Sequence, residues 1–204
     1  MAKNLMNEAE LYVIKHWEDA QLLEESMEDV RAKYKEVCQR VVDAVAELHP
    51  ELDASVICLA QSRTSGEIAL GRTSWPMQDN KYPTGMWVYN LRLEHLTAED
   101  SEDPSGGIWI AKKEITGFDF AAARSAMMAA AQTMLSPEEL QRVSPADTFD
   151  NLLWFDAPSK KEILNALTDG DGQRLVELLV SQFDFMARFI PALDQVLQGY
   201  AKSK

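Results

Sequence analysis

Apolar residues recur at alternating intervals of three and four from residue 6 to residue 48, a stretch that contains neither proline nor glycine. This spacing is typical of a helix with a coiled-coil-like seam. After Tyr34 the stripe widens, because Cys38, Val42 and Val45 add a second apolar row. A wider stripe indicates contact with a core, so we expect the second half of this helix to pack on the domain and the first half to project or to lie against another chain. The seam consists of Met6, Ala9, Val13, His16, Ala20, Leu23, Met27, Val30, Tyr34, Val37, Val41, Ala44 and Leu48.

Strand-like patterns begin after Pro50, which ends the helix because proline disfavours a helical conformation in the residue before it. Short turns rich in glycine, proline and polar residues separate these segments and favour an antiparallel meander. In the third segment Trp87 and Tyr89 alternate on the same side as two leucines, which predicts a sheet core rather than a ligand site. The predicted strands are Ala54–Ala60, Glu67–Trp75, Met86–Leu93 and Gly107–Ala111.

The rest of the chain has mainly helical patterns. Ser136-Pro137-Glu138-Glu139 is a capping box with proline at the first helical position, and Pro191 is expected to kink the last helix. The predicted elements are a helix over 118–134, a loop or broken helix over 144–155, a short helix over 159–167 and a long helix over 171–198. The pattern predicts an α+β fold in which a small antiparallel sheet of about four strands packs with helices. We divide the chain into a long N-terminal helix over 1–50 and an α+β globular domain over 51–204.

Composition narrows the classes of partner. The 204 residues include 46% hydrophobic residues, enough for a sizeable core, and carry a net charge of −13. An acidic chain argues against direct binding to nucleic acids and to anionic membranes, because both depend on lysine and arginine. Cys38 and Cys58 form no CxxC motif, and we find neither an apolar leader nor a membrane-length run. These features predict a cytoplasmic protein.

No catalytic constellation emerges from the motifs. The three histidines, His16, His49 and His95, lack ligand spacing, and no serine stands in a G-x-S-x-G elbow. No predicted strand carries the acid-x-Lys of a metal-dependent nuclease. The Asp-Gly-Asp-Gly that begins at Asp169 departs from a calcium-binding loop at positions six and twelve. We therefore expect no catalytic residue, metal ligand or cofactor, and incline towards a protein that is not an enzyme.

Three hypotheses about function remain. The first is an accessory or adaptor subunit that self-associates, or docks into a larger complex, through its N-terminal helix. The second is an acidic inhibitor, of the immunity or DNA-mimic type, that binds a basic partner. The third is a small-molecule-binding or enzymatic domain. The candidate residues are Val13, His16, Leu23, Met27 and Val30 for the interface, Glu24, Glu25, Glu28 and Asp29 for the acidic face, and Arg72, Trp75 and Lys112 for the ligand.

Overall fold

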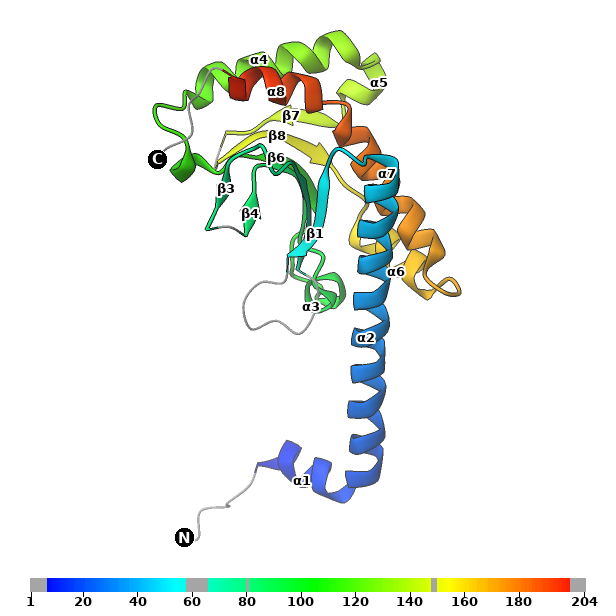
Figure 1. Ribbon diagram of the computed structural model, residues 1–204. Coiled ribbons are helices and arrows are strands. Elements are labelled where there is room, and N and C mark those ends of the chain that lie inside the picture. Colours follow the sequence, from blue (N-terminus) through cyan, green and yellow to red (C-terminus); the bar gives the residue numbers. More distant parts are fainter. Residues whose placement is uncertain (1–6, 58–65, 80, 148–149, 199–204) are drawn as a thin grey trace.

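The computed structural model has the predicted α+β architecture, with a globular domain and a long helix that extends from it (Figure 1). The structure describes residues 7–57, 66–79, 81–147 and 150–198. The last three residues of the predicted strand Ala54–Ala60, which include Cys58, lie outside the described part. Cys38 is fully buried.

The N-terminal stretch forms two helices rather than one. These are α1 (Glu8–Lys15) and α2 (Trp17–Leu48). α1 begins with a capping box, because the Asn7 side chain accepts a hydrogen bond from the Glu10 amide at 2.9 Å and the Glu10 carboxylate accepts one from the Asn7 amide at 2.6 Å. The chain turns at His16, whose backbone leaves the helical region and whose ring lies 4.4 Å from that of Tyr12. The sequence has no proline or glycine here to signal this turn.

The main sheet is antiparallel and has more strands than predicted. Five strands of five or six residues pair in the order β1-β2-β5-β6-β8, and the three-residue β7 adds to the β8 edge. A small separate hairpin of two-residue strands, β3 and β4, lies within the predicted loop after β2. The strands are β1 (Asp53–Ile57), β2 (Glu67–Gly71), β3 (Met77–Gln78), β4 (Tyr82–Pro83), β5 (Gly85–Tyr89), β6 (Ser105–Trp109), β7 (Val143–Pro145) and β8 (Asn151–Asp156).

The prediction of a loop or a broken helix over 144–155 is wrong, because most of this segment belongs to β7 and β8. β8 is buried on both sides, and its sequence, NLLWFD, is a nearly continuous apolar run. Such a run shows no period of two and cannot be distinguished by pattern from part of a buried helix. The partner strand β6 decides the conformation by supplying a ladder of hydrogen bonds.

The helices after the sheet strands agree closely with the patterns. The capping box at Ser136 is present at the start of α5, where the Ser136 hydroxyl accepts a hydrogen bond from the Glu139 amide at 3.2 Å. The last predicted helix is broken rather than kinked, with Pro191 in the first turn of its second part, where its missing N–H costs nothing. The helices are α3 (Leu93–Thr97), the 3₁₀ turn η1 (Lys112–Glu114), α4 (Phe120–Met134), α5 (Pro137–Leu140), α6 (Lys160–Thr168), α7 (Gln173–Ala187) and α8 (Ile190–Gln198).

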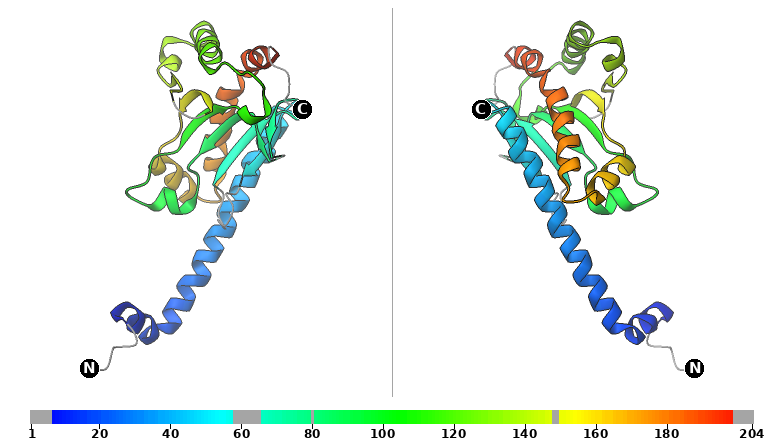
Figure 2. Two further views of the ribbon diagram at one scale, coloured as in Figure 1. Left: turned by 90° about the vertical axis from the view of Figure 1, so that its left-hand side faces the viewer. Right: turned by 90° about the vertical axis from the view of Figure 1, so that its right-hand side faces the viewer.

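The main core lies between one face of the sheet and the second half of α2 together with α7 (Figure 2). Tyr34 is fully buried there, and its hydroxyl donates a hydrogen bond to the carbonyl of Leu91. Burial raises the pKa of the Tyr34 hydroxyl well above its usual value. The expectation that the second half of the long helix packs on the domain is confirmed, since its buried residues begin at Tyr34.

The sheet has a second, aromatic face, which changes the interpretation of Trp87 and Tyr89. Met86 and Val88 of β5 point into the main core, whereas Trp87 belongs to a small separate buried cluster. β5 ends at Tyr89, and Asn90 has a positive φ of 62°. The chain therefore changes direction, and Leu91 enters the main core although it alternates in sequence with Trp87. Trp87 is buried as expected, but on the opposite side of the sheet from Leu91.

Candidate interaction surface

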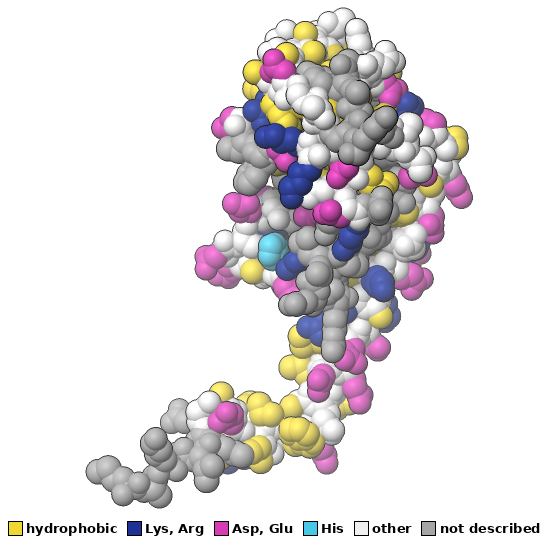
Figure 3. Space-filling model, turned by 60° about the vertical axis from the view of Figure 1, so that its left-hand side comes forward, with side chains coloured by type: hydrophobic (Ala, Val, Ile, Leu, Met, Phe, Trp, Pro, Cys, Tyr) yellow, Lys and Arg dark blue, Asp and Glu magenta, His cyan; other side chains and the backbone are white. Residues whose placement is uncertain are grey.

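The first half of the long helix extends beyond the globular domain, and α1 turns sideways at its tip (Figures 1 and 2). We call residues 7–33 the arm. All described side chains in the arm are exposed except those of Ala20 and Arg31, which are partly buried. Figure 3 shows apolar side chains gathered over α1 and the beginning of α2. The large exposed apolar residues of the arm are Leu11, Tyr12, Val13, Ile14, Trp17, Leu22, Leu23, Met27 and Val30.

The apolar stripe of α2 is continuous from the core into the arm. A helix turns by about 100° per residue, so Leu23, Met27 and Val30 lie on the same side of α2 as Tyr34 and Val41. Tyr34 and Val41 are fully buried by the domain, whereas Leu23 keeps 63% of its surface exposed and Met27 keeps 46%. The same side of one helix is therefore covered in its second half and bare in its first.

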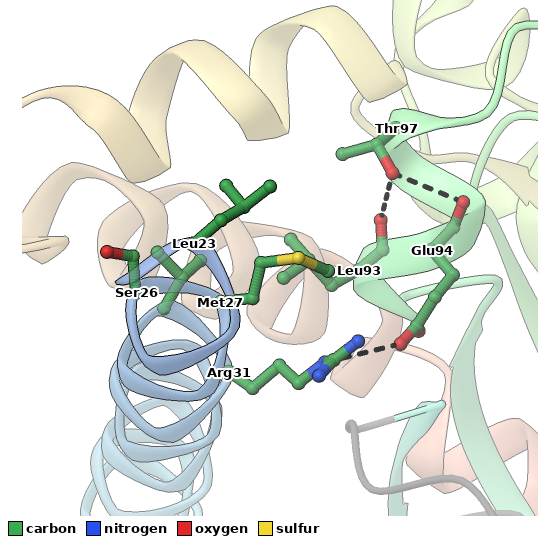
Figure 4. Close-up of a pocket in the computed structure, with 8 residues that line it drawn as sticks. Leu23, Ser26, Met27, Arg31, Leu93, Glu94 and Thr97 are labelled. Atoms are coloured by element: carbon green, nitrogen blue, oxygen red, sulfur yellow. Dashed lines mark hydrogen bonds and ion pairs between the residues drawn. The ribbon is translucent and has the colours of Figure 1, made fainter. Parts of the chain in front are cut away.

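A groove lies where this stripe leaves the domain (Figure 4). Its volume is about 330 Å³, and α2 supplies one wall while the short helix α3 supplies the other. An ion pair of 3.8 Å between the Arg31 Nε and the Glu94 carboxylate joins the two walls. On α3, the Thr97 hydroxyl donates to the carbonyl of Leu93 at 2.9 Å, so the groove presents mainly apolar atoms. Its lining comprises Leu23, Ser26, Met27, Val30, Arg31, Leu93, Glu94 and Thr97.

The predicted interface residues occupy two parts of the arm. Leu23, Met27 and Val30 line the groove, Val13 is exposed on α1, and His16 lies at the turn between the helices. The His16 Nδ1 lies 3.7 Å from the Asp19 carboxylate. Sequence analysis missed the second wall, because residues up to 93 were assigned to a strand. The apolar pair Leu93 and Leu96, spaced three apart, is the signal of α3 that was available.

The predicted acidic face lies on the side of α2 away from the stripe. Glu24, Glu25, Glu28 and Asp29 are all exposed, and helical geometry places them roughly 60–160° around the axis from Met27 and Val30. The arm is therefore amphipathic, with a bare apolar side and an acidic side. The two surfaces do not compete for the same partner.

The three predicted ligand contacts lie at the other end of the domain. The Trp75 indole donates a hydrogen bond to one carboxylate oxygen of Asp194 at 2.7 Å, and the Arg72 guanidinium pairs with the other oxygen. Arg72 also lies over the Trp75 ring, 5.4 Å from its centre. Lys112 lies instead over the ring of Phe120 at 5.2 Å. The structure thus brings Arg72 and Trp75 together against Asp194 of α8, which already serves as the partner of their polar groups. A ligand role for the three residues stays a prediction.

Comparison of the chain with protein-family models, with curated proteins and with solved structures finds no match. Within the described ranges, no three His, Cys, Asp or Glu side chains gather in a way that could hold a metal ion. No helix in that part of the chain has both the length and the apolarity needed to cross a membrane. The interpretation of function therefore rests on the chain's own surfaces.

Proposed function

We propose that this protein is a non-enzymatic adaptor that forms a homodimer through its arm, with the two arms antiparallel. The observation that carries the proposal is the concentration of exposed apolar residues. Of the ten large apolar side chains that are exposed in the described part of the chain, nine lie in the arm. Such a concentration of exposed apolar residues marks an interaction site, because contact of apolar surface with water is unfavourable and a partner removes it.

The exposed apolar area is of the size that a stable dimer needs. The nine side chains of the arm are each roughly half exposed, so two copies offer on the order of 1,000 Å² of apolar surface. A specific interface buries about 1,200–2,000 Å² in total, of which a little over half is apolar. This total includes the four exposed apolar side chains of α1, Leu11, Tyr12, Val13 and Ile14, so an interface of standard size needs α1 to be covered together with the paired segments of α2.

The order of small and large residues along the stripe supports an antiparallel register. With the two helices related about residue 25, Leu23 of one chain lies opposite Met27 of the other. The small Ala20 then lies opposite Val30, so that each bulky residue meets a smaller or flexible one. The paired segment covers residues 17–33, about 25 Å of helix, and ends where Tyr34 becomes buried in its own domain.

Charges that flank the stripe favour the same orientation. Helical geometry places Asp19 and Lys33 on one flank, and Glu24 on the other. Antiparallel helices bring equivalent flanks together, so Asp19 of one chain meets Lys33 of its partner. Parallel helices would instead bring Asp19 against Glu24, a like-charged pair that opposes association. The rest of the acidic side, Glu25, Glu28 and Asp29, stays in water in either orientation.

Light scattering on the full-length protein over a range of concentrations tests the proposal. A dimer that persists at 1 M salt is expected, because apolar contacts resist screening. An acidic inhibitor would behave differently, since the protein alone would be monomeric and its complex with a basic partner would weaken steeply with salt. A monomer at every concentration would contradict the homodimer and would favour the acidic inhibitor, in which the acidic side of the arm binds the partner.

A further inference from the structure

The aromatic face of the sheet is built around a cavity that the proposed function does not use. Ala69 and Trp87 form its buried base, and Tyr89 and Trp109 pack against them. Gly107 is required beneath these rings, because a Cβ at that position would lie 2.8 Å from the Asn151 Oδ1 and 3.0 Å from the Tyr89 ring. The face is therefore shaped to hold several aromatic rings close together.

Two of the rings form a corner. The centres of the Trp87 and Trp109 rings are 5.6 Å apart and their planes meet at 65°. Tyr89 continues the wall, since its ring is nearly parallel to that of Trp87, with an interplanar angle of 12° and a centre-to-centre distance of 5.8 Å. The cavity between these residues has a volume of about 260 Å³, and Glu67 and Gln78 complete the described lining.

The polar atoms of the rings are turned to partners in the protein. The Trp87 indole N–H donates to the carbonyl of Pro83 at 3.0 Å, and the Tyr89 hydroxyl donates to the Asn151 Oδ1 at 3.0 Å. These bonds fix the orientation of both rings. Trp87 keeps only 3% of its surface exposed, so the ring surface that remains for a ligand belongs mainly to the partly buried Tyr89 and Trp109, whose faces are electron-rich.

Glu67 is the single charged residue among the described residues that line the cavity. Its side chain is partly buried, and no hydrogen bond or ion pair from another described residue reaches its carboxylate. Burial raises the pKa of the Glu67 carboxyl, and the positive charge of Arg92 opposes this shift to a lesser degree. Burial, and to a lesser degree the Glu67 charge, also raise the pKa of the Tyr89 hydroxyl. The effect of the Glu67 charge agrees with the position of its carboxylate beside the aromatic wall.

We propose that this aromatic pocket binds an organic ammonium group, with Trp87 in its base, Tyr89 and Trp109 as its walls and Glu67 as its counter-ion. Aromatic faces attract cations through their quadrupole, and a cage of several rings favours an alkylated ammonium, which is weakly hydrated. The Glu67 carboxylate opposes an anion, and stacking of a nucleobase would require neighbouring positive charge instead. The pocket is smaller than the cavities that hold drug-sized ligands, so it fits one head group, such as that of choline or of a trimethylated lysine side chain.

Calorimetric titration of the full-length protein with choline tests the pocket. The matched probe is 3,3-dimethylbutan-1-ol, which has the same shape and no charge. The proposal predicts that choline binds at least tenfold more tightly than this alcohol, because the cation–π and carboxylate interactions both require the charge. Equal affinity for the two probes would show a merely apolar pocket, and no binding of choline or of the peptide named below at millimolar concentration would overturn the proposal outright.

Substitutions and a second ligand complete the experiment. Glu67→Gln keeps the shape of the side chain and should weaken choline binding by roughly tenfold, whereas Glu99→Gln makes the same charge change on an exposed loop and should leave it unchanged. Trp109→Phe supplies a weaker ring with Glu67 intact and should weaken binding several-fold, and a wild-type affinity in both pocket variants would refute the assignment. A peptide with trimethyl-lysine distinguishes the two sources of the ammonium group, since a free ligand predicts that only choline binds and a side-chain ligand predicts that the peptide binds more tightly.

Discussion

Leu22 and Leu23 provide a matched pair of substitutions for testing the arm. Both leucines have 63% of their surface exposed, and they are neighbours in one helix, so their replacement by alanine has the same effect on helix propensity. Only Leu23 lies on the apolar stripe, because Leu22 is rotated by about 100° around the helix axis. The proposed dimer buries Leu23 and leaves Leu22 near its edge.

The expected cost follows from the area that Leu23 loses to water. Burying the exposed part of a leucine side chain contributes about 1–2 kcal/mol, and the two-fold symmetry of the dimer places the substitution at the interface twice. Leu23→Ala should therefore weaken the dimer by about 2–4 kcal/mol, which is roughly 30- to 700-fold in Kd. Sedimentation equilibrium measures this constant for each variant. Leu22→Ala should change the constant by less than roughly threefold, and an equal effect of the two substitutions would refute the assigned stripe.

Further predictions concern the orientation of the arms and the stability of the domain. Asp19→Lys should weaken the dimer and Lys33→Asp in the same chain should restore it, by about 0.2–1 kcal/mol for each of the two pairs in a sedimentation assay, whereas a parallel dimer would show no rescue. Asp194→Ala should lower the free energy of unfolding in urea by about 1–3 kcal/mol, because it leaves a partly buried guanidinium and a buried indole without their acceptor. The hydrogen bond from the Ser136 amide, followed by the bond from Arg188, lowers the pKa of the Glu139 carboxyl, so its contribution to stability is present at neutral pH and is lost as the pH falls through that lowered pKa. Glu139→Gln should therefore lower the Tm at pH 7 and leave it unchanged in strong acid, and a Tm difference that is the same at both pH values would contradict this.

The sequence was most informative where periodicity was long. The widening of the stripe after Tyr34 correctly predicted which half of α2 is buried, because a core covers a broader part of a helix than a single partner does. It failed where tertiary contacts decide the conformation. The turn at His16 has no breaker residue, and β8 has an apolar run without alternation, so neither could be predicted from local patterns.

The candidate sites were predictable to different degrees for the same reason. The exposure of Leu23, Met27 and Val30 could be predicted from the width of the helix stripe, and their role in an interface stays a prediction. The aromatic pocket was not found, since Trp109 and Glu67 come from separate strands and meet only through the pairing of β2, β5 and β6. The positive φ of Asn90 also places Trp87 and Leu91 on opposite sides of the sheet. The presence of an asparagine in a sequence is not enough to predict that conformation.

Hydrogen exchange on the full-length protein at two concentrations tests the arm-mediated dimer most directly. In a lone projecting helix the backbone amides of residues 17–33 exchange quickly, because few tertiary contacts protect them. The dimer predicts that these amides are protected at high concentration and lose protection on dilution. The amides of residues 37–45 in the same helix are buried against the domain and serve as the internal control, with protection that does not depend on concentration. Exchange of residues 17–33 that is the same at both concentrations would contradict the proposed dimer.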